Sequence, residues 1–259
     1  MPTTRVMRLR AISVTTEPYI CTERAELVTE YYSKHYGQQP AALLRAGNFY
    51  NLMANKTIYI GDDELIVGER GSGPRAVSTY PELCCHTLED LDTLNSRNKN
   101  PFRVSPQARK IYADTIIPYW SGQGRTMRER VFAAMTPKWH DAFDAGVFTE
   151  FMEQRSPGHA ICDDKIYRMG MLELKDNIAQ VRATLDPAHN SLDQARDLEL
   201  QAMAICADAI ILLAERYRDK AREMAAGASD PVRRIELEQI AEICGHVPAH
   251  SPRNFHEAL

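Results

Sequence analysis

The sequence has no long apolar run and no excess of one charge. No segment approaches the roughly 20 consecutive apolar residues that a membrane-spanning helix needs, and no apolar stretch follows the basic N-terminal residues as in a signal peptide. The 31 Lys and Arg residues are interspersed with 35 Asp and Glu residues, for a net charge of −4. This balance argues against a nucleic-acid surface. The sequence therefore predicts a cytoplasmic protein whose partners are small molecules or proteins.

Cysteines are few and scattered. Six occur in 259 residues, a chain too large to depend on disulfide bonds, so we expect reduced thiols. The Cys84-Cys85-His86 cluster lacks a second spaced pair, and adjacent cysteines do not easily serve one tetrahedral zinc site. A second group near the end is better explained as structural, since Pro248 interrupts the helix that it would need. That group consists of Cys244, His246, His250 and His256.

Phosphate-binding motifs are also missing. The glycine-rich stretch 68–74 is not followed by Gly-Lys-Ser/Thr, and no Gly-x-Gly-x-x-Gly opens a helix. We therefore expect no nucleotide cofactor and no metal on this chain.

Helix signals dominate what is present. At four places a capping residue precedes a proline at the first helical position. The clearest helix spans residues 198–224, where two adjacent apolar rows form a face too wide for a half-exposed helix, so it should pack against others. We also expect helices over 23–36 and 41–54, and a small hairpin from the β-branched runs 57–60 and 64–67. The four starts are Ser105-Pro106, Thr136-Pro137, Asp230-Pro231 and Ser251-Pro252.

The last predicted helix is short. It opens at Ser251-Pro252, and Phe255, Ala258 and Leu259 begin an apolar face just where the sequence stops. A chain more often ends in a polar, frayed tail. We therefore expect these residues to be the N-terminal piece of a longer protein.

One polar, aromatic-rich segment ends in a turn that carries a single imidazole. It runs from Phe148 to His159, with Pro157 and Gly158 just before the histidine. Proline fixes its own φ and glycine can adopt a positive φ, so the pair can aim His159 in a direction that neither helix nor strand would give it. Histidine gives or takes a proton near neutral pH. His159 is therefore either a hydrogen-bonded loop residue or an acid–base group.

Several blocks of the sequence carry a family resemblance. They are Cys21-Thr-Glu-Arg-Ala25, Asp63-Glu-Leu-Ile-Val-Gly68, Tyr80-Pro-Glu82, Ile116-Ile-Pro-Tyr-Trp120, Pro157-Gly-His159, and Ala241-Glu-Ile-Cys244 leading to Pro248-Ala-His250. In this order they resemble the N-terminal part of the glycyl radical enzymes, the pyruvate formate-lyase-like family. Two segments, 79–90 and 148–159, look most like the members of that family that dehydrate hydroxyproline.

The resemblance implies a fold and an activity. The fold is mainly α with a few short strands, and residues 1–259 would form the N-terminal part of a ten-stranded α/β barrel of the pyruvate formate-lyase type. A radical S-adenosylmethionine activating enzyme with an iron–sulfur cluster places a radical on a glycine, and a cysteine thiyl then takes a hydrogen from the substrate. Loss of water from trans-4-hydroxy-L-proline gives pyrroline-5-carboxylate. The resemblance also implies a homodimer and a place in anaerobic metabolism.

Two site residues follow from the resemblance. The positions of Phe151 and His159 line the substrate pocket, the phenyl ring packing against the substrate ring and the imidazole lying near the departing hydroxyl. Both are thus predicted to bind substrate, and His159 is predicted to be catalytic. By residue type alone, Phe151 is more typical of a core.

The sequence also departs from the family. No cysteine is followed by Val-Glu, and the Arg-Val-x-Gly-Tyr motif of the radical glycine does not occur. Cys162 lies three residues after His159 but matches no family position. The chain alone is therefore expected to be inactive, truncated before the thiyl cysteine loop and the glycyl radical domain. The alternatives are another glycyl radical lyase, acting on glycerol or propanediol or on a C–N or C–S bond, and a non-catalytic helical binding domain.

Overall fold

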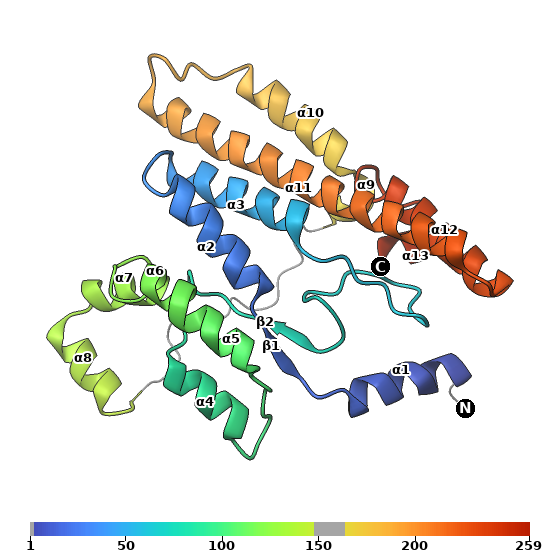
Figure 1. Ribbon diagram of the computed structural model, residues 1–259. Coiled ribbons are helices and arrows are strands. Elements are labelled where there is room, and N and C mark those ends of the chain that lie inside the picture. The colour runs from blue at the N-terminus through green and yellow to red at the C-terminus, as the bar shows by residue number, and fades with distance from the viewer. Residues whose placement is uncertain (1–2, 148–163) are drawn as a thin grey trace. The chain divides into compact units, whose positions relative to one another are not determined.

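The computed structural model describes residues 3–147 and 164–259, and this part of the chain is mostly helical (Figure 1). Its two strands are short. β1 (Tyr19–Cys21) and β2 (Ala76–Ser78) pair in parallel, with Ile20 opposite Val77. The prediction of a mainly α fold with a few short strands is confirmed. No helix among the residues described has the length and apolar character that crossing a membrane requires.

The described residues form two compact units. Unit 1 contains residues 3–16, 31–74 and 164–259, and unit 2 contains residues 17–30 and 75–147. The helix α2 (Glu23–His35) belongs to unit 2 in its first part and to unit 1 in its last.

Unit 1 is organised around one long helix. α11 (Ser191–Gly227) is 37 residues long, about 55 Å at 1.5 Å per residue. It packs against α3 (Ala41–Asn55), α10 (Met171–Arg182) and α12 (Pro231–His246). The remaining helices of this unit are α1 (Thr4–Thr15), α9 (Lys165–Arg168) and α13 (Phe255–Ala258).

The helix predicted over 198–224 is present and packs against others, as expected. It begins earlier, because the Asn190 side chain accepts hydrogen bonds from the N–H groups of Leu192 and Asp193 and caps the helix. Five of its six buried residues are alanines, and such small side chains let neighbouring helices approach closely. The burial of α11 is not uniform, since Met203 is 47% exposed.

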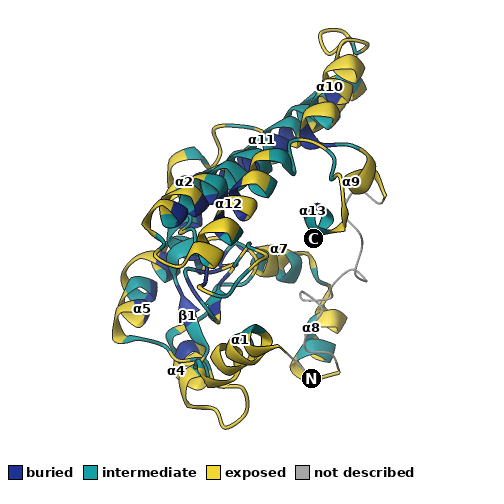
Figure 2. Cartoon of the chain, turned by 90° about the vertical axis from the view of Figure 1, so that its right-hand side faces the viewer, coloured by how far each residue is buried: buried dark blue, intermediate teal, exposed yellow. Residues whose placement is uncertain are grey.

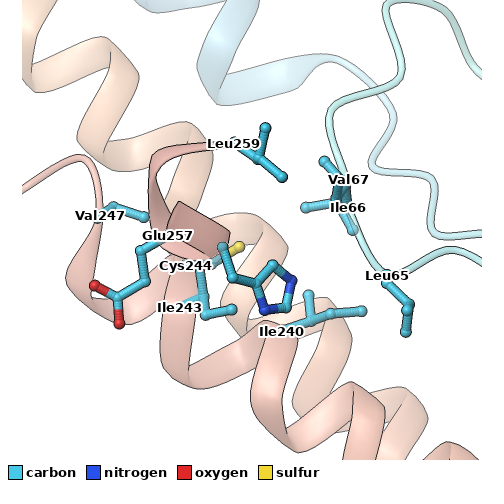
Figure 3. Close-up of a pocket in the computed structure, with 10 residues that line it drawn as sticks. Leu65, Ile66, Val67, Ile240, Ile243, Cys244, Val247, Glu257 and Leu259 are labelled. Atoms are coloured by element: carbon cyan, nitrogen blue, oxygen red, sulfur yellow. The ribbon is translucent and has the colours of Figure 1, made fainter. Parts of the chain in front are cut away.

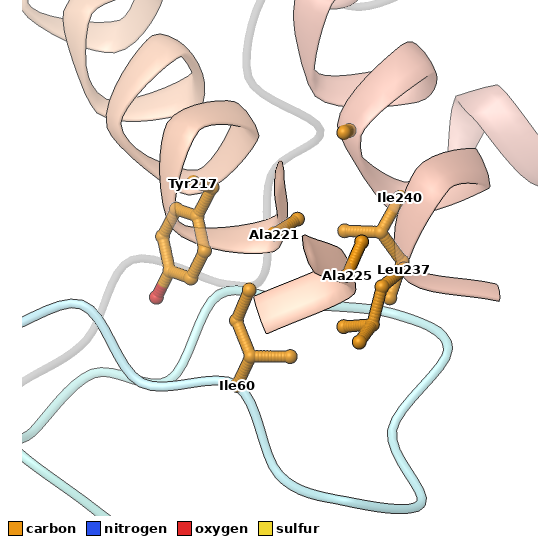
Figure 4. Packing of buried hydrophobic residues seen from close by; sticks show 7 residues of the cluster. Ile60, Tyr217, Ala221, Ala225, Leu237 and Ile240 are labelled. Carbon is orange, nitrogen blue, oxygen red and sulfur yellow. The ribbon is translucent and has the colours of Figure 1, made fainter. Parts of the chain in front are cut away.

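One apolar cluster of unit 1 lies where α11 packs against α12 (Figure 4). Tyr217 and Ala221 of α11 pack against Leu237 and Ile240 of α12. Ile60, from the loop that follows α3, packs against the same cluster. Burial of these side chains removes apolar surface from water at about 25 cal/mol per Å². The cluster therefore fixes the loop as well as the two helices.

The predicted hairpin over 57–60 and 64–67 is wrong. These residues form no strand; their segment is a loop held by arginine side chains. Arg216 donates to the carbonyl oxygens of Met53 and Lys56 at 2.6 and 2.7 Å, and Arg233 donates to those of Gly61 and Glu64 at 2.7 and 2.9 Å. Arg233 thus ties the loop to α12, and Arg216 bonds carbonyls at the C-terminal end of α3.

Three of the four predicted capped starts open helices at the proline. They are α5 (Pro106–Ile111), α8 (Pro137–Asp144) and α12. The fourth is wrong, because α13 begins after Asn254 rather than at Pro252. The Asn254 side chain accepts from the N–H of Glu257 at 3.1 Å and so sets the helix start.

Unit 2 surrounds the strand pair with short helices. Besides α5 and α8 they are α4 (Leu88–Ser96), the π-helical turn η1 (Tyr112–Ile116), α6 (Ile117–Trp120) and α7 (Met127–Ala134). The π-helical turn comes just before Pro118, which has no N–H for the regular helical pattern. It ends with the N–H of Ile117 bonded to the carbonyl of Tyr112.

Trp120 anchors the core of unit 2. It is 1% exposed, and its indole N–H donates to the Thr29 hydroxyl at 2.8 Å, while that hydroxyl donates to the carbonyl of Ala25 at 2.6 Å. We expect Trp120→Phe to lower the free energy of unfolding by about 2 kcal/mol, because it removes a buried hydrogen bond and leaves a gap. Urea unfolding measures this change.

The matched control is the other tryptophan. Trp139 is 56% exposed, so Trp139→Phe should change the free energy of unfolding by less than about 0.5 kcal/mol. Equal effects of the two substitutions would contradict the role given to Trp120.

Candidate functional site

The two residues predicted to bind substrate, Phe151 and His159, lie outside the described residues. Cys162 does as well. Their roles stay predictions. The structure does describe the residues that follow this segment and the partners that hold them in place.

The N-terminus of α10 is held by a distant part of unit 1. The N–H of Met171 donates to the carbonyl of Pro248 at 2.8 Å, and that of Leu172 donates to the carbonyl of Ala249 at 3.1 Å. The first N–H groups of a helix have no partner within the helix, so the 247–250 segment satisfies two of them. This anchor fixes the chain soon after the predicted site segment.

Gly170 allows this close approach. A β-carbon at this position would lie 2.2 Å from the carbonyl oxygen of Ala249 and 2.4 Å from the Cα of His250. Both are backbone atoms and cannot rotate away. The anchor therefore requires glycine here.

Two hollows are lined in part by residues at the end of the chain. The first, of about 130 Å³, lies between α12 and the 65–67 loop and is mostly apolar. In Figure 3, Ile66 and Val67 of the loop face Leu259 and Ile240 across it. The second, of about 200 Å³, lies beside α9 and is lined by Tyr167, Met169, Met171 and His250 among others. Val247, Glu257 and Leu259 line both.

Glu257 is the acidic group common to the two hollows. Its side chain is 3% exposed. Its carboxylate accepts from the backbone N–H and the Nε–H of Arg253, at 2.6 and 2.8 Å. In Figure 3 the carboxylate points away from the apolar residues of the first hollow. The hydrogen bonds from Arg253, first from its side chain and then from its backbone, lower the pKa of Glu257 to about 2. Glu257 is thus a fixed anion and holds no proton at neutral pH.

Stability should depend on pH through Glu257. Its pKa lies below the ordinary value of 4.5, so its contribution is complete above pH 4.5 and is lost as the pH falls through about 2. We expect Glu257→Gln, which cannot ionise, to lower Tm at neutral pH. The Tm difference between the two proteins should shrink as the pH falls from 4.5 towards 2. A difference that stays constant with pH would contradict the ion pair.

Cys244 lines the first hollow as a neutral thiol. Burial raises its pKa to about 11, so it carries no charge near pH 7. The first hollow therefore holds no ionised thiol, and His256 is its other titratable side chain besides Glu257 and Cys244.

The histidines near Cys244 have structural contacts. His246 Nε2 lies 3.0 Å from the carbonyl oxygen of Ser251, to which it donates, and its ring stacks on His250 with centroids 5.2 Å apart. Among the residues that the structure describes, no three His, Cys, Asp or Glu side chains gather so as to hold a metal ion.

The Cys84-Cys85-His86 cluster comes directly after a turn at 81–83 in unit 2. Arg128 Nη1 lies 3.3 Å from the Cys84 sulfur. Burial raises the pKa of Cys85 to about 11. The turn is tied to α7, because the N–H groups of Met127 and Arg128 donate to the carbonyls of Glu82 and Leu83 at 2.9 and 3.0 Å.

Two of the resembling blocks meet in unit 2. Arg24, from the block at 21–25, forms an ion pair with Glu82, from the block at 80–82, and stacks over the ring of Tyr80 at 3.9 Å. It also donates to the carbonyl of Thr79 at 3.0 Å. No periodicity in the sequence indicates this pair. The one sequence feature that pointed to these two residues is that both occur in blocks that carry the family resemblance.

One Cys-x-Glu spacing, Cys21 and Glu23, was not among the predicted site residues. Cys21 lies in β1 opposite Ser78 and is 7% exposed. Glu23 lies in the first turn of α2, where a carboxylate is favoured by the helix dipole. The strand and the helix start account for both residues.

Comparison with known proteins adds the relatives. The family model described as pyruvate formate lyase-like matches residues 2–259. The chain is 45% identical over 255 residues to trans-4-hydroxy-L-proline dehydratase of Clostridioides difficile, covering 98% of this chain and 32% of the relative. It is 34% identical to isethionate sulfite-lyase of Nitratidesulfovibrio vulgaris, covering 94% of this chain and 30% of the relative.

A solved structure agrees with these relatives. The crystal structure of hydroxyproline dehydratase from Clostridioides difficile, with trans-4-hydroxy-L-proline bound, matches with a TM-score of 0.93 and 44% identity. The match covers 100% of this chain and 32% of that one. The chain thus spans about a third of the length of the relatives it matches.

Proposed function

This chain belongs to the pyruvate formate lyase-like family, and we propose that it is the N-terminal part of a glycyl radical dehydratase. The substrate proposed is trans-4-hydroxy-L-proline, and the product is pyrroline-5-carboxylate. The observation that carries this choice is the 45% identity to the hydroxyproline dehydratase, against 34% to the isethionate sulfite-lyase, over nearly the same span.

The proposed mechanism gives this chain a binding and a proton-donating role. Phe151 packs against the ring of the substrate, and the imidazole of His159 lies near the departing hydroxyl. Departure of hydroxide needs a proton, and a positioned imidazole contributes about 10²–10⁴-fold through acid–base help. An aromatic lining also keeps water away from the radical.

The radical chemistry belongs to other parts of the protein. The sequence holds no Arg-Val-x-Gly-Tyr motif and no cysteine followed by Val-Glu. We propose that the thiyl cysteine, its base and the radical glycine come from polypeptide beyond these 259 residues, and that the chain alone is inactive. The proposed partners are a radical S-adenosylmethionine activating enzyme and a second copy of the full protein, in the cytoplasm.

A substrate panel tests the proposal. The full-length protein is activated anaerobically by its activating enzyme and offered trans-4-hydroxy-L-proline, glycerol, choline and isethionate in turn. Pyrroline-5-carboxylate from the first substrate, with much slower reaction of the others, is the expected result. Reading the gene downstream of Leu259 for the cysteine and glycine motifs is an independent check on the radical chemistry.

A second function has one observation in its favour. The isethionate sulfite-lyase of Nitratidesulfovibrio vulgaris is 34% identical over 254 residues. Cleavage of a C–S bond would release sulfite, which a colorimetric assay detects. Sulfite from isethionate, with hydroxyproline untouched, would replace the dehydratase proposal by this one.

A further inference from the structure

The N-terminal helix α1 has little apolar packing, and Leu9 is its one half-buried apolar side chain. None of its twelve residues is buried. Met7 and Val14 are 60% and 70% exposed, and Figure 2 shows the helix largely in the colour of exposed residues. A helix of this length is marginal in water without tertiary contacts. Something other than burial of its side chains must keep it in place.

Ion pairs to the 61–64 loop and to α12 hold α1. Arg5 pairs with Glu236 of α12, and its Nε also lies 3.8 Å from Asp63 Oδ1. Arg8 Nε donates to Asp63 Oδ2 at 2.6 Å. The two carboxylates are the less exposed partners, with side chains 14% and 15% exposed. Hydrogen bonds from Arg8 and Arg5 lower the pKa of Asp63 and of Glu236, respectively, so both stay charged at neutral pH.

The loop and helix that α1 contacts are joined to each other by Arg233 of α12. Arg233 donates to Glu236 at 3.1 Å and to the carbonyls of Gly61 and Glu64. It therefore keeps the loop against α12 and leaves Glu236 paired when Arg5 is absent. The docking is also imperfect, since the buried Nε of Arg5 finds no hydrogen-bond acceptor among the described residues. An unmet donor of this kind weakens the docked state.

We propose that α1 is a strap held by charge: it detaches from α12 and the 61–64 loop when the ion pairs of Arg5 and Arg8 are screened, while the rest of unit 1 stays folded. Detachment exposes Asp63 and Glu236 and frees a helix with three arginines and no acidic residue. Detachment of α1 is a reversible local opening of the kind that hydrogen exchange measures.

The test is hydrogen exchange with mass spectrometry on the protein, in about 0.05 M and about 1 M KCl. At 1 M the Debye length is about 3 Å, comparable with the 2.6 and 3.8 Å that separate Asp63 from Arg8 and Arg5, so the salt weakens these pairs. We expect amide exchange in residues 4–15 to rise about tenfold, with no change in α11 or α12. Arg5→Gln should give the same rise at low salt.

Arg10 provides the matched control, because it lies on the same helix, is exposed, and has no ion pair to the residues that the structure describes. Arg10→Gln should leave exchange unchanged. The inference is overturned if α1 stays protected at high salt, or if it opens only together with α11 and α12. If Arg5→Gln fails to fold, the salt titration of the unsubstituted protein decides between the same two outcomes.

Discussion

Replacing His159 by glutamine is expected to lower kcat of the activated full-length enzyme on trans-4-hydroxy-L-proline by about 10²–10⁴-fold. Glutamine keeps a hydrogen-bond donor but cannot release a proton to the leaving hydroxide. The imidazole should also account for one limb of the pH profile of kcat, and that limb should disappear in the variant. Steady-state rates of pyrroline-5-carboxylate formation across pH measure both effects.

Two controls separate this role from a loss of structure. The glycyl radical yield, measured by electron paramagnetic resonance after activation, should be unchanged in His159→Gln. His189, an exposed residue paired with Asp186 at 2.9 Å, serves as the matched histidine, and His189→Gln should keep full activity. If His159→Gln retained kcat with an unaltered pH profile, the assignment of His159 as proton donor would be wrong.

Replacing Gly170 by alanine is expected to lower the free energy of unfolding by about 3 kcal/mol. The added methyl would lie 2.2 Å from the carbonyl oxygen of Ala249, a contact that only a backbone shift can relieve. That shift breaks the hydrogen bonds from Met171 and Leu172 to the 247–250 segment. For a chain of this size the expected fall in Tm is roughly 6–12 °C, measured by differential scanning calorimetry.

Gly227 is the matched control. It lies at the end of α11, and nothing lies within 4 Å of a β-carbon built there. Alanine is the better helix former by about 1 kcal/mol, so Gly227→Ala should leave Tm unchanged or raise it. A Tm for Gly170→Ala equal to that of the unsubstituted protein would show that the 247–250 segment does not press on Gly170.

Local signals predicted several of the helices but not the strands. A capping residue before proline marks a helix start through short-range hydrogen bonds, and three such starts lie where the sequence placed them. The β-branched runs at 57–60 and 64–67 form a loop rather than a hairpin, and Arg233 of α12 bonds the carbonyls of Gly61 and Glu64 in it while Arg216 of α11 bonds those of Met53 and Lys56 just before it. Residues 150 or more positions away provide that contact, and local propensity cannot foresee it.

The site was predictable only through the family resemblance. Spacing alone left His159 as either a loop residue or an acid–base group, and Phe151 as a core residue. The hollow beside α12 was not predictable, because the loop at 65–67, three residues of the helix, Val247 just after it and the end of the chain form it together. The pairing of Arg24 with Glu82 likewise joins residues far apart in the sequence.

Product formation tests directly whether this chain is part of a hydroxyproline dehydratase. The activated full-length protein is incubated with trans-4-hydroxy-L-proline without oxygen, and pyrroline-5-carboxylate is quantified by mass spectrometry. We expect product at many turnovers per enzyme, and none without the activating enzyme. A fully activated protein that carries the glycyl radical and leaves hydroxyproline unchanged would contradict this expectation.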